Sequence, residues 1–288
     1  MTPSPTCDAT RTLITGARGM LGSDLMRAFA SQNPAGLSSA DMDITNRDAV
    51  RTVLHEKRPQ WVIHAAGMTH VDGCELDPES AYRVNGLGSR NLALACEEVG
   101  ATLLYVSTDY VFDGEKSEPY TEFDPTHPLS VYGKSKLAGE MFVREFCRRH
   151  CIVRTSWLFG KNGKNFVQTV LRLAAGGDDL RIVSDQVGSP TYTWHLAQKI
   201  GEIVTSGRLG IYHITNSGHC SWFELAQATL RSRQHSARVV PITTAEYPTP
   251  ARRPRSSILR NYILELEGIT LLPPWQQALS EYLAQCHG

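Results

Sequence analysis

Over the first 158 residues, short apolar runs alternate with segments whose apolar residues recur at helical spacing. The runs 11–15, 61–64, 102–106 and 152–154 are predicted strands, with a weaker strand near Leu37. Helices are predicted between these runs, over residues 20–30, 47–57, 78–99 and 130–148. Because parallel strands need crossover connections, which are usually helices, this alternation predicts an α/β fold with a doubly wound parallel (Rossmann) sheet.

Beyond residue 158 the predicted strands are shorter and the alternation is less regular. Helices are predicted over residues 166–175, 194–205, 222–231 and 274–285, and strands over 181–183 and 211–214. Residues 247–255 are predicted to form a loop, because the prolines of this stretch exclude a helix. We therefore expect a dinucleotide-binding domain over residues 1–158, joined by later segments at about 193–215, and a smaller mixed α/β substrate domain over 159–288.

The composition is that of an ordinary globular protein, and it narrows the classes of partner. Lys+Arg and Asp+Glu each number 29, so the chain lacks the basic excess of a protein that binds nucleic acid or an anionic membrane. No apolar run approaches the roughly 20 residues that span a bilayer, and the first residues lack the pattern of a secretory signal. The seven cysteines are scattered with no C-x-x-C pair, so we expect no metal site and a cytoplasmic protein with reduced thiols.

A glycine-rich turn directly follows the first predicted strand. The sequence TGARGMLG over residues 15–22 gives the pattern G-x-x-G-x-x-G between a strand and a helix. In this position Gly16 permits the tight turn, Gly19 lets the backbone approach a pyrophosphate, and Gly22 lets the helix pack closely on the strand. The amide groups and the positive dipole end of the helix favour phosphates. The pattern therefore predicts a dinucleotide site, the alternative being a purely structural turn.

The cofactor expected at this turn is NADPH, with NADH as the alternative. A nicotinamide cofactor with a free ribose hydroxyl usually meets an acidic residue about 20 residues further along the chain. The second predicted strand is followed by the sequence LSSAD over residues 37–41, with no acid at the strand tip. Arg18, inside the glycine turn, is instead a candidate partner for an adenosine 2′-phosphate. The alternative is that Arg18 is solvated surface.

Tyr132 and Lys136 are four residues apart in a predicted helix and therefore share one face of it. A free tyrosine has a pKa of about 10, and an ammonium group one turn away favours the phenolate and lowers that pKa. We therefore expect Lys136 to lower the pKa of Tyr132 and to hold the cofactor ribose. The fourth predicted strand leads into Ser107, Thr108 and Asp109, where a hydroxyl can stabilise a developing oxyanion or simply cap the next loop.

Together these elements resemble the extended short-chain dehydrogenase/reductase family. The exact residues of the motifs resemble one branch of that family, the dTDP-4-dehydrorhamnose reductases. The resemblance covers nearly the whole chain, from Leu13 to about Tyr282. The motifs that carry it are TGARGMLG (15–22), HAAGMTHVDGCE (64–75), VSTDYVFDG (106–114), PLSVYGKSKLAGE (128–140), VRTSWLFG (153–160), DQVGSPT (185–191) and YPTPARRP (247–254). The resemblance implies an NADPH-dependent enzyme that reduces the 4-keto group of a nucleotide sugar, dTDP-4-dehydro-L-rhamnose, to give dTDP-L-rhamnose.

The resemblance also implies roles for individual side chains at the reaction centre. Tyr132 is implied to be the proton donor, and Lys136 its partner and a ligand of the ribose. Thr108 takes the hydroxyl position that often holds serine in the wider family. Asp109, beside it, resembles an acid close to the substrate that tunes the proton relay.

Substrate- and cofactor-binding residues follow from the same resemblance. Trp157 is implied to stack on the sugar. Arg253, in the proline-rich loop, is a candidate ligand of the nucleotide diphosphate, because a guanidinium suits bidentate phosphate binding. With the glycine turn, the resemblance gives these cofactor-binding residues, besides Tyr132 and Lys136: Gly16, Arg18, Gly19, Met20, Leu21, Gly22, Asp43, Ile44, Ala65, Ala66, Gly67, Met68 and Thr69.

Two departures from the branch leave alternatives open. Some members dimerise through a magnesium cluster of glutamates, but Asp24 and Trp194 stand at the matching positions, and an indole cannot ligate a metal. We therefore expect no metal, and a monomer or a weak homodimer. Residues 255–257 lack an asparagine common in the branch, so another nucleotide-linked 4-keto-deoxysugar is an alternative substrate. A further alternative is a non-catalytic nucleotide-binding regulatory subunit of the methionine adenosyltransferase type.

Overall fold

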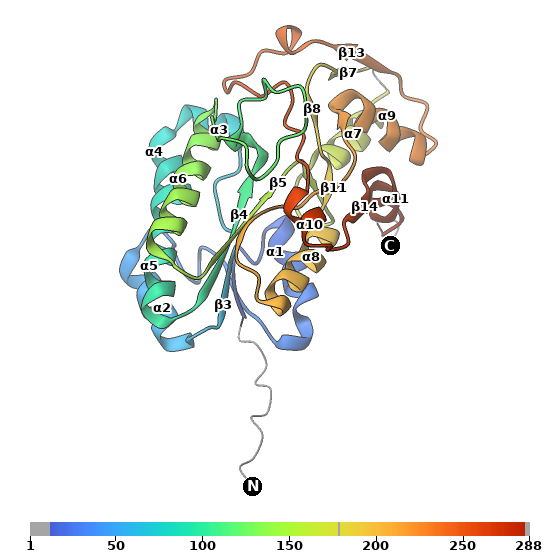
Figure 1. Cartoon of the computed structure of the whole chain (residues 1–288). Coiled ribbons are helices and arrows are strands. Elements are labelled where there is room, and N and C mark those ends of the chain that lie inside the picture. Colours follow the sequence, from blue (N-terminus) through green and yellow to red (C-terminus); the bar gives the residue numbers. More distant parts are fainter. Residues whose placement is uncertain (1–11, 178, 286–288) are drawn as a thin grey trace.

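The computed structural model describes residues 12–177 and 179–285, and it has a six-stranded parallel sheet at its centre (Figure 1). The strand order is β10-β5-β4-β3-β1-β2. The strands are β1 (Thr12–Thr15), β2 (Ala35–Leu37), β3 (Trp61–His64), β4 (Thr102–Thr108), β5 (His150–Thr155) and β10 (Gly210–His213). The chain winds outward in one direction from β1 to β2 and in the other from β3, so the predicted doubly wound sheet is confirmed. Ligands of such sheets bind at this switch point, at the carboxyl ends of the strands.

Helices cover both faces of the sheet (Figure 1). The helices α1 (Met20–Ala28) and α8 (Thr193–Ser206) contact each other and share a core with one face. The other face packs against α2 (Arg47–Lys57), α5 (Ser89–Val99) and α6 (Val131–Phe146). All residues of β1, β3 and β4 are buried, as parallel strands covered on both sides require.

The long helical stretch predicted over residues 78–99 is confirmed, but its middle is a π-helical turn that the sequence analysis did not predict. The stretch consists of α4 (Pro78–Ala81), a π-helical segment η2 (Tyr82–Gly88) and α5, which follow one another without a break. Within η2, the Asn85 side-chain amide bonds both the N–H and the carbonyl of Met68 and donates to the Ser135 hydroxyl at 3.0 Å. These tertiary hydrogen bonds tie the π turn to the segment after β3, and a sequence period does not encode them.

The chain beyond β5 forms helices and two-stranded sheets beside the carboxyl ends of the main sheet (Figure 1). Its elements, apart from α8 and β10, are β6 (Leu158–Phe159), α7 (Phe166–Ala174), β7 (Leu180–Val183), β8 (Val187–Gly188), β9 (Thr191–Tyr192), β11 (Asn216–Ser217), β12 (Cys220–Ser221), α9 (Trp222–Ser232), β13 (Val239–Ile242), η4 (Thr244–Glu246), α10 (Tyr262–Leu266), β14 (Leu272–Pro274) and α11 (Trp275–Gln285). Because β10 pairs with β5 and α8 packs on α1, both elements lie with the main sheet. The division into two domains stays a prediction.

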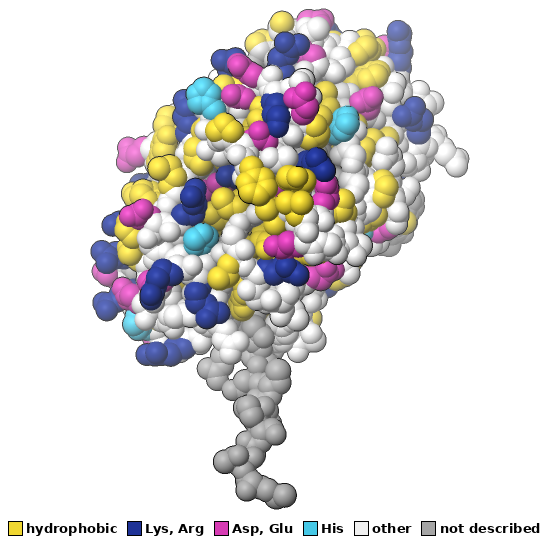
Figure 2. Space-filling model, viewed as in Figure 1, with side chains coloured by type: hydrophobic (Ala, Val, Ile, Leu, Met, Phe, Trp, Pro, Cys, Tyr) yellow, Lys and Arg dark blue, Asp and Glu magenta, His cyan; other side chains and the backbone are white. Residues whose placement is uncertain are grey.

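Short elements complete the part that surrounds the site. The helix α3 (Val71–Leu76) follows β3, and the 3-10 helices η1 (Ala30–Gln32) and η3 (Asp109–Val111) follow α1 and β4. Charged side chains of both signs are interspersed over the described residues on the face in Figure 2. Among the helices of the described ranges, none is both long enough and apolar enough to cross a bilayer.

Candidate active site

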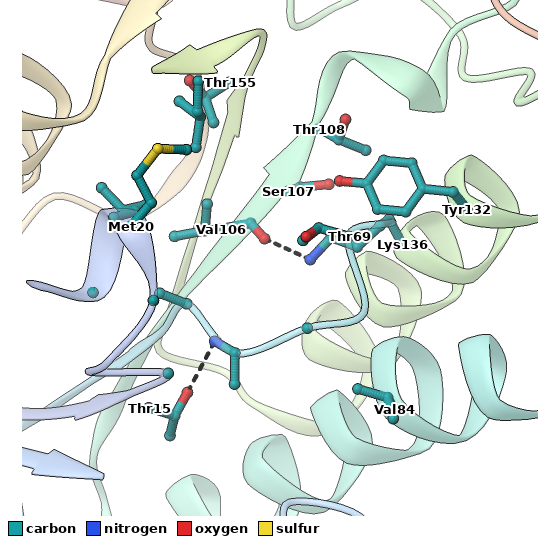
Figure 3. A pocket seen from close by; sticks show the side chains of 18 of the residues that line it. Thr15, Met20, Thr69, Val84, Val106, Ser107, Thr108, Tyr132, Lys136 and Thr155 are labelled. Carbon is teal, nitrogen blue, oxygen red and sulfur yellow. Dashed lines mark hydrogen bonds between the residues drawn. The ribbon is translucent and has the colours of Figure 1, made fainter. Parts of the chain in front are cut away.

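A cavity of about 780 Å³ lies at the carboxyl ends of β1, β3, β4 and β5 (Figure 3). We call it the main cavity. Thr15, Thr108 and Thr155 line it at three of these strand ends, and Trp222 and Arg253 line it from the second half of the chain. The main cavity is therefore at the position where doubly wound sheets bind nucleotides and substrates.

The main cavity brings together all the site residues proposed from the sequence except Met68. Those that line it are Gly16, Arg18, Gly19, Met20, Leu21, Gly22, Asp43, Ile44, Ala65, Ala66, Gly67, Thr69, Thr108, Asp109, Tyr132, Lys136, Trp157 and Arg253. Met68 does not line it. The Met68 N–H donates to Asn85 Oδ1 at 2.8 Å, and the Met68 carbonyl accepts from Asn85 Nδ2 at 3.0 Å, so its backbone supports the neighbouring lining residues instead.

The turn between β1 and α1 has room only for glycine at two positions. Gly16 has a φ of 70°, in the left-handed region, and a Cβ there would lie 2.7 Å from the Ala66 nitrogen. A Cβ on Gly22 would lie 2.0 Å from the Gly16 carbonyl oxygen. Among the described residues, no side chain caps the N-terminus of α1, which begins directly after Gly19. Its first amide groups thus suit an anion, and the turn fits the pyrophosphate of a dinucleotide.

Residues after β2 extend the main cavity beyond the glycine turn. Ser38, which the sequence analysis did not propose as a ligand, lines it together with Asp43. The Asp43 carboxylate accepts hydrogen bonds from the N–H and the hydroxyl of Thr45, both at 2.9 Å, which fixes its orientation. Hydrogen bonds from Ser38, and to a lesser degree the charge of exposed Arg18, lower the pKa of Asp41. Arg18 and Ser38 both line the main cavity.

Tyr132 and Lys136 lie in the first turns of α6 and face the main cavity, as their spacing predicts (Figure 3). The helix begins where it does because the Ser130 hydroxyl accepts a hydrogen bond from an N–H of its first turn. The Lys136 amino group donates to the Val106 carbonyl oxygen at 2.7 Å. It also lies 4.1 Å from the centroid of the Tyr105 ring.

The expectation that Lys136 lowers the pKa of Tyr132 is wrong. Burial raises the pKa of Tyr132, and a hydrogen bond with Thr108 offsets this only in part. Burial also lowers the pKa of Lys136 to about 7, although the Glu140 carboxylate raises it. At neutral pH the amino group is therefore only partly charged, and it is bonded to the Val106 carbonyl. Tyr132 consequently keeps its proton at neutral pH, which suits a proton donor better than a base.

Thr108 and Asp109 form a hydrogen-bonded pair at the end of β4. The Thr108 hydroxyl donates to Asp109 Oδ1 at 3.0 Å and accepts from the Tyr110 N–H at 3.2 Å, so it also caps η3. Burial raises the pKa of Asp109 to about 7, against hydrogen bonds from Ser257 and Thr108 that lower it. Thr108, Asp109 and Tyr132 all line the main cavity, and the Thr108 hydroxyl acts to lower the pKa of Tyr132.

Ser107, the other hydroxyl at this strand end, has a different partner. It donates to the buried Glu140 carboxylate at 2.5 Å. Arg154 Nε and Nη2 donate to the two oxygens of the same carboxylate at 2.9 and 2.7 Å. Ser107 is thus part of a buried ion-pair network, whereas the Thr108 hydroxyl acts on the pKa of Tyr132.

The tryptophan predicted to stack on the sugar is itself stacked on a second tryptophan. The rings of Trp157 and Trp222 have centroids 3.4 Å apart and planes 4° apart. Trp157 has a φ of 46°, and a Cβ on Gly188 would lie 2.4 Å from its indole. Trp222 was not among the site residues predicted from the sequence, where its only signal is an aromatic residue directly after the helix-capping Ser221. The two indoles form one aromatic wall of the main cavity.

Arg253, the candidate diphosphate ligand, is held by a carboxylate from the other half of the chain. Its Nη1 and Nη2 atoms donate to Oδ1 and Oδ2 of Asp72, each at 2.9 Å. Nη1 also lies 2.8 Å from Thr249 Oγ1 and 2.9 Å from the Ala251 carbonyl oxygen. Asp72 belongs to α3 and was not among the residues proposed from the sequence.

Asp24 and Trp194 stand at the positions where some members of the branch have glutamates of a magnesium cluster, and their surroundings do not fit a metal ion. Asp24 accepts a hydrogen bond from the Thr193 hydroxyl at 2.6 Å and lies 3.5 Å from Arg27 Nη2. The Arg27 guanidinium in turn lies 3.5 Å from the centroid of the Trp194 ring. Over residues 12–177 and 179–285, no three His, Cys, Asp or Glu side chains gather as a metal site would need.

A doubly wound sheet with a glycine turn after β1 and a tyrosine–lysine pair facing the same cavity defines an oxidoreductase of the extended short-chain dehydrogenase/reductase class. Within that class, the chain belongs to the RmlD substrate binding domain family, whose model matches residues 10–287. The family expected from the sequence is therefore confirmed.

Named relatives resemble the chain over almost its whole length. A dTDP-4-dehydrorhamnose reductase of Streptomyces griseus is 43% identical, over 94% of this chain and 92% of the relative. The spore coat polysaccharide biosynthesis protein SpsK of Bacillus subtilis is 41% identical, over 96% and 98%. Among solved structures, a dTDP-4-dehydrorhamnose reductase of Bacillus anthracis in complex with NADP has a TM-score of 0.94 and 40% identity, covering 96% of this chain and 99% of the other.

Proposed function

We propose that this protein reduces the 4-keto group of dTDP-4-dehydro-L-rhamnose to the alcohol of dTDP-L-rhamnose, with NADPH as reductant. The observation that carries the proposal is that Tyr132, Lys136 and Thr108 line one cavity together with the glycine turn. Relatives of similar length are named dTDP-4-dehydrorhamnose reductases, and one such structure contains NADP, which supports both the reaction and the cofactor.

The residues of the main cavity fit NADPH along its length. The uncapped start of α1 and the glycine turn would hold the pyrophosphate. Arg18 would bind the adenosine 2′-phosphate, and Tyr132 and Lys136 the ribose next to the nicotinamide. When bound, NADPH supplies the hydride that is added to the keto carbon.

The side chains of this protein supply the proton and steady the oxygen. The keto oxygen gains negative charge as the carbon is reduced, and Tyr132 donates its phenolic proton to complete the alcohol. With Asp109 protonated and donating to the Thr108 hydroxyl, Thr108 donates its own proton in a hydrogen bond to the same oxygen. Thr108 then passes a proton to the phenolate and takes one from Asp109, whose pKa of about 7 lets it exchange with solvent near neutral pH.

The second half of the chain would bind the nucleotide sugar. The Trp157 and Trp222 rings offer an aromatic wall for the sugar, and Arg253 offers donors for the diphosphate. The same reaction on another dTDP-linked 4-keto sugar is the second candidate function. A Streptomyces niveus relative named dTDP-4-keto-6-deoxy-D-glucose reductase favours it, being 37% identical over 94% of this chain.

The test is to incubate the purified protein with NADPH and either dTDP-4-dehydrorhamnose or dTDP-4-keto-6-deoxy-D-glucose, and to follow NADPH absorbance and product. We expect faster turnover of dTDP-4-dehydrorhamnose, with one NADPH consumed per product. Faster turnover of the other sugar would favour the second candidate. A protein that binds NADPH but neither reduces these sugars nor binds dTDP would be the regulatory subunit considered as an alternative, and the proposal would be wrong.

We further propose that residues 1–158, with about 193–215, bind the dinucleotide and that 159–288 mainly bind the substrate. The glycine turn at β1, and the positions of Trp222 and Arg253, support this division. The cytoplasmic location and the monomeric or weakly dimeric state stay predictions from the sequence.

A further inference from the structure

We propose that Asp72 is a positioning residue that holds Arg253 ready for the diphosphate of the nucleotide sugar. This inference rests on the proposed function, because it concerns how the same cavity recognises that substrate. Asp72 and Arg253 are 181 residues apart in the chain. Their pairing joins α3, which follows the lining segment 65–69, to the loop over residues 247–255.

The Asp72 carboxylate organises both the arginine and the backbone around it. Its two oxygens accept from Nη1 and Nη2 of Arg253, and Oδ1 also accepts the Ala251 N–H at 3.2 Å. Arg253 Nη1 also donates hydrogen bonds to Thr249 Oγ1 and to the Ala251 carbonyl oxygen. One carboxylate thus fixes the guanidinium and the loop segment that carries it.

The pairing uses the terminal edge of the guanidinium and leaves its side edge for a ligand. A guanidinium carries five N–H donors, and Nε–H with the second Nη2–H forms the side edge. In the described part of the chain, no acceptor is bonded to Arg253 Nε, while both oxygens of Asp72 occupy the terminal edge. Two parallel donors match two phosphate oxygens.

Arg253 also lies where a diphosphate would pass between two cavities. It lines the main cavity, which contains Tyr132, and a second cavity of about 890 Å³ lined by residues from 113–115 and 244–255. A nucleotide sugar has its diphosphate between the sugar and the nucleoside. An arginine shared by both cavities is therefore placed for the diphosphate when the sugar is at Tyr132.

The pair is suited to positioning more than to stabilising the fold. The side chains of Arg253 and Asp72 are 20% and 26% exposed, so solvent screens their attraction. The hydrogen bond from Arg253 lowers the pKa of Asp72, which keeps the carboxylate charged at neutral pH. Ordering a free arginine at the moment of binding would weaken affinity up to about tenfold, and a preformed pair avoids this loss.

The test measures dTDP binding by isothermal titration to the wild-type protein, Asp72→Asn, Arg253→Gln and the double variant. Arg51→Gln is the matched control, because the Arg51 side chain is 61% exposed, its ion-pair partner is Glu98 rather than Asp72, and it lines neither cavity. NADPH binding to each variant checks that the fold and the glycine turn are intact. We expect Asp72→Asn to weaken dTDP binding by about tenfold, with NADPH binding unchanged.

The double variant separates positioning from a general effect of charge. If Asp72 acts through Arg253, Asp72→Asn should weaken binding in the wild-type background and have little further effect in Arg253→Gln. The same variant should raise KM for the nucleotide sugar far more than it lowers kcat. Arg51→Gln should bind dTDP within about twofold of the wild type, since an exposed surface charge outside both cavities contributes little.

Three results would overturn the inference. One is Asp72→Asn binding dTDP as tightly as the wild type. The second is tighter binding, which would mean that the carboxylate mainly repels the diphosphate. The third is that Asp72→Asn weakens dTDP binding as much in the Arg253→Gln background as in the wild type, which would show that Asp72 does not act through the arginine. A wild-type protein that does not bind dTDP at all would instead overturn the proposed function, and this inference with it.

Discussion

The Lys136 amino group is hydrogen bonded to the Val106 carbonyl oxygen at 2.7 Å, in a fully buried position one helical turn from Tyr132. Burial lowers the pKa of this lysine to about 7, while the pKa of Tyr132 is raised. The lysine therefore changes its charge in the pH range where the enzyme would work, and the tyrosine stays protonated. Because the charge of Lys136 changes near neutral pH, its effect on the free energy of unfolding can be measured as a function of pH.

Lys136 should destabilise the folded protein at neutral pH and below, and less so as the pH rises. In the unfolded chain a lysine binds its proton up to about pH 10.5, but in the folded protein only up to about 7. Between these values the unfolded state binds more protons, so the free energy of unfolding rises with pH. The difference between wild type and Lys136→Met should therefore increase from pH 7 to 10, by at most about 5 kcal/mol.

Denaturant unfolding without added cofactor, at several pH values, measures this difference. Subtracting the Lys136→Met curve removes the titration of the cysteines and tyrosines that both proteins share. If the free energy of unfolding of the wild type minus that of Lys136→Met stayed constant or fell from pH 7 to 10, a buried and partly neutral lysine would be contradicted.

Gly22→Ala should lose both stability and cofactor binding. The added Cβ would lie 2.0 Å from the Gly16 carbonyl oxygen, so α1 must move away from the turn. Overpacking of this kind costs about 1–3 kcal/mol, and here it displaces the amide groups proposed to bind the pyrophosphate. Urea unfolding and NADPH titration measure the two effects. Gly201→Ala in α8 is the control, because its nearest neighbours would be 4.0 Å away and alanine favours a helix. If Gly22→Ala and Gly201→Ala had the same stability and the same affinity for NADPH, the close approach of Gly22 to the Gly16 carbonyl oxygen would be contradicted.

Trp222→Ala should raise KM for the nucleotide sugar by about two- to twelvefold, because Trp157 would lose the ring that it stacks on and with it about 0.5–1.5 kcal/mol. Trp222→Phe keeps an aromatic face against Trp157 and should recover most of the loss. Steady-state kinetics at saturating NADPH measure both variants. Trp194→Phe is the control, since Trp194 packs against Arg27 and does not line the main cavity. An unchanged KM in Trp222→Ala would mean that the second indole has no part in substrate binding.

Arg18→Ala should weaken NADPH binding more than NADH binding. An exposed arginine beside the glycine turn can pair with a 2′-phosphate, which NADH lacks. We expect the dissociation constant for NADPH to rise up to about tenfold and that for NADH to change little. Fluorescence titration with both cofactors measures the ratio. Arg47→Ala removes an exposed positive charge outside the main cavity and should leave both constants unchanged. Equal weakening of both cofactors by Arg18→Ala would contradict a role in phosphate recognition.

The parts of the site that were predictable from the sequence are those encoded by local spacing. The glycine turn lies between a strand and a helix, and Tyr132 and Lys136 share a helix face because they are four residues apart. The sheet was predictable for the same reason, since each strand and crossover helix is a continuous segment. Local spacing could not, however, predict where the Lys136 amino group points, because its partner Val106 belongs to a different strand.

The parts that were missed depend on contacts between distant segments. Arg253 was identified by the loop that carries it, but Asp72 is 181 residues away, and only the folded chain brings the two together. Trp222 was overlooked because an aromatic residue at a helix start has many uses, and its stacking on Trp157 depends on tertiary packing. The π-helical turn at Asn85 follows from hydrogen bonds to Met68 and Ser135, which no residue period reveals.

Tyr132→Phe tests the central claim most directly, with turnover of dTDP-4-dehydrorhamnose and NADPH as the measurement. The substitution keeps the ring in place and removes only the proton that the ketone oxygen needs. We predict a loss of kcat of about 10²–10⁴-fold with NADPH affinity retained. Tyr212→Phe, which removes a phenol hydroxyl outside the main cavity, should retain wild-type turnover. A folded Tyr132→Phe protein that reduces the sugar at the wild-type rate would contradict the account.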